Sequence, residues 1–284
     1  MECWQVQQAL NQPVGSWNVS SVTDMVAMFY AATSFNQPLD NWDVSSVTDM
    51  TWMFQEASNF NQPLNNWNVG NVIDMSSMFK NASNFNQPLS RWDFRSVMKM
   101  ESMLSNATRF NQNISGWDVS YVFDKSFMFM DTNSFNQPLN EWDVSSVTDM
   151  TSMFEAALQF NQPLGQWATG NVVITKGMFD LAEYFNQPLD SWDVSNVTDM
   201  ALMFYGAISF NQPLGSWDVS NIANMTSMFS RATRFGQNLC QWFNESYINY
   251  PAVKDMLLES NCPNTSDPDF SHQDAFCTTC YKPI

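Results

Sequence analysis

The hydrophobic residues of this chain return at one fixed interval of 25 residues. A phenylalanine column runs from Phe35 to Phe235 and a methionine column from Met28 to Met228, without an insertion in either. A third column is made of tryptophan: Trp17, Trp42, Trp67, Trp92, Trp117, Trp142, Trp167, Trp192, Trp217 and Trp242. A period this strict predicts a solenoid, in which each repeat forms one coil and buries its apolar face against its neighbours.

Three shorter patterns lie within each repeat. The apolar–polar–apolar alternation at 42–44 predicts a short strand. In the segment 47–57, apolar residues recur at spacings of three and four, which is typical of one helical face, and Ser46 and Asp49 read as its capping box. The Asn–Gln–Pro run at 61–63 predicts a turn into the next coil. We therefore expect an α/β solenoid with one short parallel strand and one short helix in each coil.

The repeat ends after Trp242, and the remainder of the chain has a different composition. Residues 250–257 place Val253, Met256 and Leu257 at spacings of three and four, which predicts an amphipathic helix. Three cysteines follow in residues 261–284. We expect a repeat solenoid over 1–242, with a partial first coil and about nine full coils, and a cysteine-containing C-terminal cap over 243–284.

The run FNQPLDNWDVSSVTDMTWMF, from Phe35 to Phe54, resembles the repeat of the BspA-like leucine-rich-repeat surface proteins of bacteria and protists. The likeness covers residues 10–242. It is weakest where Arg95, Lys99 and Lys125 replace Ser, Asp and Met, and in a second departure from the pattern at 168–169 and 174–176. It implies a leucine-rich-repeat-like α/β solenoid, display outside the cell, and a role in adhesion or surface assembly. It implies no catalytic residues.

Charge and composition exclude several classes of function. The net charge is −17 with only 11 Lys and Arg, so we expect no binding to nucleic acid. No apolar run is long enough to span a bilayer, so we expect no membrane insertion, and no basic and apolar leader opens the sequence. The chain has one His and none of the common phosphate-loop, metalloprotease or nucleophile-elbow motifs, so we expect no enzyme.

Acidic residues recur on the outward position after each tryptophan. This column consists of Asp43, Asp93, Asp118, Asp143, Asp193 and Asp218. Neighbouring carboxylates could offer oxygen ligands to calcium, which makes these residues weak calcium candidates. The alternative is that they are solvated or bonded locally, and no spacing matches a dedicated calcium loop. No other cofactor is expected.

Five cysteines are present, and four lie near the C-terminus. Cys240, Cys262, Cys277 and Cys280 are disulfide candidates with three possible pairings. A zinc site from Cys262, Cys277, Cys280 and His272 is a weaker alternative, because thiols oxidise outside the cell. Cys3 is far from the others in the solenoid, and it is either a buried thiol or the site of an intermolecular disulfide.

Two further sets of residues are candidates for contact or modification. A basic band that could dock an acidic partner consists of Arg91, Arg95, Lys99, Arg109 and Lys125, although drift of the repeat would also explain it. Glycosylation candidates are Asn18, Asn81, Asn106, Asn113, Asn244 and Asn264, whereas the sequons at Asn196 and Asn224 fall in the expected capping turn.

These observations favour a non-enzymatic extracellular or cell-surface protein that acts in adhesion or surface assembly through a repetitive solenoid face. Its partners would be other proteins or glycans at a cell surface or matrix. The alternative is a subunit of an extracellular filament built by end-to-end stacking of solenoids. A third hypothesis is ice binding, which needs a regular threonine array. That array is broken, because Thr23, Thr48, Thr148 and Thr198 alternate with Ile73, Met98, Phe123 and Val173.

Overall fold

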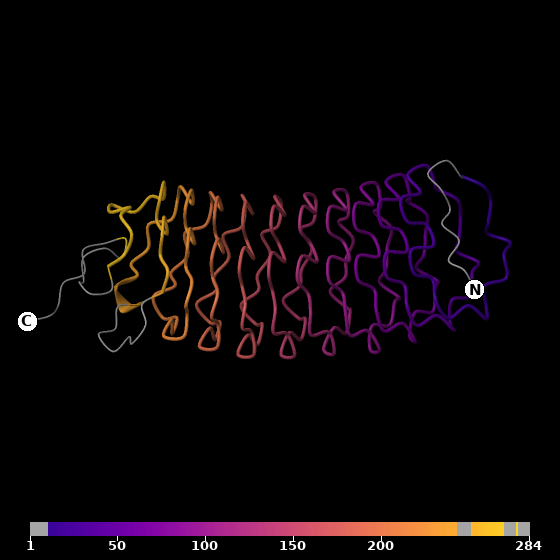
Figure 1. The fold of residues 1–284 in the computed structure, drawn as a ribbon, viewed down its shortest axis with the longest axis horizontal. Coiled ribbons are helices and arrows are strands. Elements are labelled where there is room, and N and C mark those ends of the chain that lie inside the picture. The colour runs from indigo at the N-terminus through magenta and orange to yellow at the C-terminus, as the bar shows by residue number, and fades with distance from the viewer. Residues whose placement is uncertain (1–10, 243–250, 270–276, 278–284) are drawn as a thin grey trace, which may run out of the picture.

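The computed structural model describes residues 11–242, 251–269 and 277, and over these residues the chain forms a rod of stacked coils (Figure 1). Each coil lies beside the coil one repeat earlier, and the chain advances along the long axis from the indigo to the yellow end. The 25-residue period is thus one turn of a solenoid, as predicted.

The core consists of ladders of aromatic rings. Phe60 and Phe85 are fully buried, with ring centroids 6.0 Å apart. Phe54 also stacks on Phe60, with ring centroids 4.1 Å apart and planes that differ by 11°. The tryptophans form a second ladder, in which Trp67 and Trp92 are 6.4 Å apart with planes that differ by 1°. Stacking identical residues buries both ring faces, which requires one phase throughout the chain.

Each buried tryptophan also bonds to the preceding coil. The Nε1 of Trp67 donates to the main-chain carbonyl oxygen of Leu39 at 2.9 Å, and Trp92 does the same to Leu64. The bond recurs in every coil from Trp42 to Trp242. A buried indole N–H needs an acceptor, and here the stacking direction supplies it.

The helix expected at 47–57 does not form. The short 3-10 helix η1 (Cys240–Trp242) is the one helix among the described residues. The N–H of Met53 instead bonds to the carbonyl of Met50, and Trp52 has a φ of 59°. Ala57 bonds to Phe54 in the same way, with Glu56 at 62°. A positive φ at the third residue of a four-residue turn is the signature of a type II β-turn and is incompatible with a right-handed helix.

These turns leave other N–H groups free to join the coils. Met50 donates to Asp74, Trp52 to the carbonyl of Ser76, and Phe54 to Met78, each in the next coil. Consecutive turns bring a side chain inward about every third or fourth residue, which is the spacing of a helical face. The periodicity was therefore correct for burial and wrong for conformation.

The strand expected at 42–44 is also absent, and no strand lies within the described residues. Trp42 donates to Leu39 and Val47 to Val44, so local turns use these groups. Parallel pairing occurs as single bridges at the position of Asp49, and the bridges run Asp24↔Asp49, Asp49↔Asp74, Asp74↔Lys99, Lys99↔Asp124, Asp124↔Asp149, Asp149↔Ile174, Ile174↔Asp199, Asp199↔Asn224 and Asn224↔Ala252. A ladder one residue wide does not make a strand.

The expected capping box is replaced by two separate contacts. The Oδ1 of Asp49 accepts the N–H of Thr51 at 2.8 Å, which is a local Asx turn. The hydroxyl of Ser46 donates to the carbonyl of Ser20 in the preceding coil. Because there is no helix N-terminus to cap, both side chains support the turns and the stacking instead.

The stacking continues beyond Trp242. Met225 donates to the carbonyl of Ala252 and Phe229 to that of Met256, although these coils are 28 rather than 25 residues apart at the bridge Asn224↔Ala252. Asp255 has a φ of 56°, so turns also replace the amphipathic helix expected at 250–257, of which residue 250 lies outside the described residues. Within the described part of the chain, no helix is long and apolar enough to cross a membrane.

Candidate functional site

The stacked turns create one continuous surface whose exposed chemistry changes from coil to coil. We call the surface formed by residues 24–31 and their equivalents in the later coils the turn face. Residues one repeat apart lie side by side on it, because each coil hydrogen-bonds to the next in register. Side chains that are distant in the sequence therefore gather into one site.

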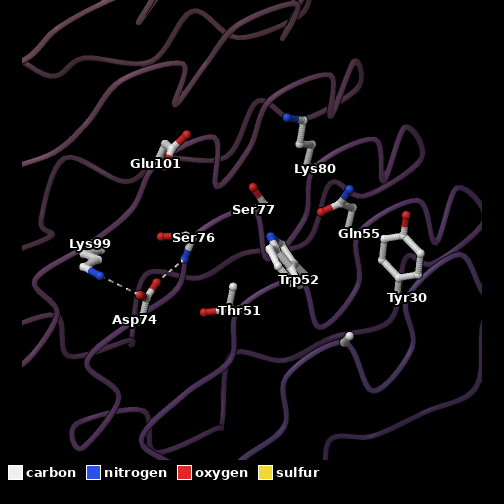
Figure 2. Close-up of a pocket in the computed structure, with 11 residues that line it drawn as sticks. Tyr30, Thr51, Trp52, Gln55, Asp74, Ser76, Ser77, Lys80, Lys99 and Glu101 are labelled. Carbon is white, nitrogen blue, oxygen red and sulfur yellow. Dashed lines mark hydrogen bonds and ion pairs between the residues drawn. The ribbon is translucent and has the colours of Figure 1, made fainter. Parts of the chain in front are cut away.

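A hollow of about 670 Å³ lies on the turn face, around Trp52 (Figure 2). Four successive coils contribute its lining residues, which are Ala27, Tyr30, Thr51, Trp52, Gln55, Asp74, Ser76, Ser77, Lys80, Lys99 and Glu101. The hollow is open to solvent and combines two aromatic rings with hydroxyl, amide, ammonium and carboxylate groups.

Trp52 differs from the residues at the same position in other coils. Ala27 and Ser77 precede and follow it, and serine recurs at this position further along the rod. Where other large residues occur, as at Phe127 and Leu202, they are half-buried, whereas Trp52 is 48% exposed. Its left-handed φ of 59° is shared with the equivalent residues of other coils, such as Ser77 (56°) and Phe127 (57°), so the exposed indole and not the backbone sets Trp52 apart.

The charged groups of the hollow are balanced in sign. The Nζ of Lys99 lies 3.6 Å from the Oδ2 of Asp74, whose Oδ1 accepts the N–H of Ser76 at 2.9 Å. Lys80 and Glu101 form no ion pair within the described residues. Two carboxylates and two ammonium groups therefore line the site, although the chain as a whole is strongly acidic.

The basic band is not a continuous surface. Lys125 is completely buried, and its Nζ donates to the carbonyls of Val122 at 2.7 Å and Val119 at 3.1 Å. Burial lowers the pKa of Lys125 to about 7. Its inclusion among exposed binding residues was therefore wrong, because the methionine position that it occupies points into the core.

The other four residues of the basic band are exposed, and three of them contact neighbouring side chains. Arg95 forms an ion pair with Asp93 at 2.5 Å, which raises the pKa of Arg95. Arg91 donates to the side chain of Asn66, and Lys99 belongs to the hollow described above. Arg109 is exposed. These four residues stay on the surface, and a partner for them is still a prediction.

The carboxylate column is bonded locally. The Oδ1 of Asp43 accepts both the N–H and the hydroxyl of Ser45, which lowers the pKa of Asp43. Asp193 has the same arrangement and the same direction of pKa shift. Equivalent bonds are made by Asp93, Asp118, Asp143 and Asp218. These bonds are those of the locally bonded alternative. Among the described residues, no three His, Cys, Asp or Glu side chains lie together as a metal site.

One bridge between candidate cysteines lies within the described residues. Cys262 and Cys277 are bonded, with their Cα atoms 4.6 Å apart. Cys240 also carries a disulfide. Because Cys262 and Cys277 are consumed in a bridge, they are not available as zinc thiolates. Cys3, Cys280 and His272 lie outside the described residues.

The sequons occupy different environments. Asn18 and Asn113 are exposed, and each accepts a bond from a backbone N–H two residues later. Asn81 and Asn106 are half-buried, and the Nδ2 of Asn106 donates to the Oδ1 of Asn81 at 2.9 Å. Asn264 is half-buried, and Asn244 lies outside the described residues. Glycan occupancy is still a prediction at all of these sites.

Two features were missed by the sequence analysis. Trp52 could have been found by comparing the turn positions of successive coils, since it replaces a small residue. Asp180 could not have been found from the sequence, because the burial of its carboxyl group depends on how the turns fold. Burial, aided by nearby Glu155, raises the pKa of Asp180 to about 7, and its Oδ1 is buried without a hydrogen-bond partner among the described residues.

The fold and the repeated contacts define a solenoid repeat protein. The chain belongs to the family described as Mycoplasma protein of unknown function, DUF285, which matches residues 1–117, 88–179 and 159–265. No curated protein matches the chain.

Proposed function

We propose that this protein is a non-enzymatic extracellular surface protein that acts in adhesion or surface assembly through its turn face. The observation that supports this most is the hollow around Trp52. An exposed aromatic ring stands there among polar groups from four coils of an otherwise regular rod. Exposed polar and aromatic residues held on a stiff scaffold suit recognition of a partner.

Other features support the extracellular part of the proposal. The bridge between Cys262 and Cys277 would persist in an oxidising compartment. The resemblance to BspA-like leucine-rich-repeat surface proteins over residues 10–242 points the same way, and we propose this finer relationship within the family. The absence of the common catalytic motifs from the sequence supports a binding role rather than an enzymatic one.

The test measures binding of the labelled full-length protein to fixed cells and to matrix-coated wells, with unlabelled protein as competitor. We expect saturable binding that is reduced by Trp52→Ser and unchanged by Trp17→Ser, because Trp17 is equally exposed (49%) but lies outside the hollow. Absence of saturable binding to every surface would overturn the proposal. Negative-stain images of the same sample would show end-to-end rods if the filament alternative were correct.

A further inference from the structure

We propose that the hollow around Trp52 binds carbohydrate, with a pyranose ring lying against the indole and its hydroxyls bonded by Gln55, Lys80 and Glu101. This inference rests on the proposed function, because it names the chemical class of ligand for the same face.

The indole of Trp52 is accessible to a ligand and is not part of the core. Its neighbours in the same column, Ala27 and Ser77, are too small to cover the ring. The core tryptophans from Trp42 to Trp242 are at most 4% exposed and bond through Nε1 to the preceding coil. Trp52 is 48% exposed and makes no such bond within the described residues. A free aromatic face suits the C–H-rich face of a sugar ring, since both are apolar and flat.

The polar groups around the ring match hydroxyls, which both donate and accept hydrogen bonds. Figure 2 shows Gln55, Lys80 and Ser77 on one side of Trp52 and Glu101 and Ser76 on another. The Gln55 amide donates and accepts, the Lys80 ammonium donates, and the Glu101 carboxylate accepts. Such a mixture can satisfy a ring of hydroxyls at several points.

The charge and the shape of the hollow narrow the class of ligand. The two carboxylates and two ammonium groups that line the hollow sum to no net charge, so they do not favour a phosphate chain or a strongly charged peptide. Its volume of about 670 Å³ is within the usual range for small-molecule sites. Because the hollow is open to solvent, it suits part of a longer, largely neutral glycan rather than an enclosed metabolite.

The first experiment applies labelled full-length protein to an array of immobilised neutral, N-acetylated and sialylated oligosaccharides. Each oligosaccharide that binds is then titrated by isothermal calorimetry. We expect neutral or N-acetylated structures to bind and Trp52→Ser to weaken them about tenfold or more, the equivalent of 1.4 kcal/mol. Serine is the natural residue at this position in four other coils, at Ser77, Ser102, Ser152 and Ser227, so the variant should keep the fold.

Two matched variants separate the ring from its surroundings. Trp52→Phe keeps an aromatic face, and Phe127 shows that phenylalanine fits at the equivalent position, so this variant should retain most of the affinity. Trp17→Ser removes an equally exposed indole outside the hollow and should bind as the wild type does. Thermal unfolding confirms that each variant is folded.

The outcomes distinguish this inference from the proposed function. Glycan binding that is unchanged in Trp52→Ser, or no binding to any glycan, overturns the carbohydrate site. If cells still bind the protein through Trp52 while no glycan does, the ligand is a protein and the proposed function stands. If glycans bind through Trp52 but neither cells nor matrix do, the carbohydrate site stands and the adhesion proposal fails.

Discussion

The Nζ of Lys125 donates to the main-chain carbonyl oxygen of Val122 across 2.7 Å inside a fully buried site. The equivalent residues one coil before and after are Met100 and Met150, both in the core. The lysine therefore replaces an apolar side chain, and two carbonyls only partly compensate for the loss of hydration.

Lys125→Met should stabilise the protein. Replacing a buried charge by an apolar residue that fits the same space is expected to raise the free energy of unfolding at pH 7 by roughly 1–4 kcal/mol. Urea unfolding followed by tryptophan fluorescence measures this. Lys254→Met, at an exposed lysine of the last described coil, is the control and should change stability little.

The gain from Lys125→Met should also depend on pH. The pKa of Lys125 is about 7 in the folded protein and 10.5 as its ordinary value, so the unfolded chain binds more protons between these values. Stability of the wild type therefore rises relative to the variant as the pH increases from about 7 to about 10.5. A constant difference over this range would contradict a buried, titrating lysine.

Asp180→Asn should stabilise the protein at pH 8 and have little effect near pH 4. The folded-state pKa of Asp180 is about 7 against an ordinary 3.8, so the folded protein binds more protons between these values. The stability that the protonated Asp180 carboxyl group contributes to the folded protein is fully present below pH 3.8 and is lost as the pH rises through 7. Thermal unfolding across this range tests the sign, with Asp190→Asn at an exposed carboxylate as control.

Asn161→Ala should destabilise the solenoid by about 1–3 kcal/mol, because it leaves a donor without its acceptor. The Oδ1 of Asn161 accepts the N–H of Asn186 at 3.0 Å and the Nε2 of Gln187 at 2.9 Å in the next coil. Asn161→Asp keeps an acceptor oxygen and should lose less stability in the same urea experiment. Equal losses would show that the contact between the coils at Asn161 depends on something other than this oxygen.

Substitutions of Ser227 distinguish a turn from a helix, because the two conformations predict opposite orders of stability for the glycine and valine variants. Ser227 has a φ of 55°, so Ser227→Gly should be neutral or stabilising, whereas Ser227→Val should be destabilising by about 1–2 kcal/mol. In a helix the order would reverse, because glycine is the poorer helix former. The thermal midpoints of the two variants measure the order directly.

The double variant Cys262→Ser/Cys277→Ser should lose about 3 kcal/mol, because its bridge closes a loop of 15 residues. The loss should appear as a lower thermal midpoint under oxidising conditions. Asp267→Asn, at an exposed residue between the two cysteines, leaves both cysteines intact and is the control. A double variant as stable as the wild type would show that the bridge does not stabilise the protein.

The candidate site could be predicted only in part. The sequence identified the outward column of Asp43 and its equivalents, but their bonds to the serine two residues later appear only in the structure. It placed Lys125 on the surface because lysine is usually exposed, whereas register with Met100 and Met150 buries it. It missed the hollow, because Trp52, Lys80 and Glu101 are distant in the chain and meet only when the coils stack.

The coil length, the inward residues and the solenoid follow from the amino-acid sequence alone, because only a stack can place a 25-residue repeat of Trp, Phe and Met in a common core. The conformation within each coil depends on contacts between coils. Residues 47–57 have the spacing of a helix, yet their N–H groups find carbonyls in the next coil while Trp52 and Glu56 turn left-handed. Turns form instead of helices because they are stabilised by hydrogen bonds between coils, which a single repeat cannot make.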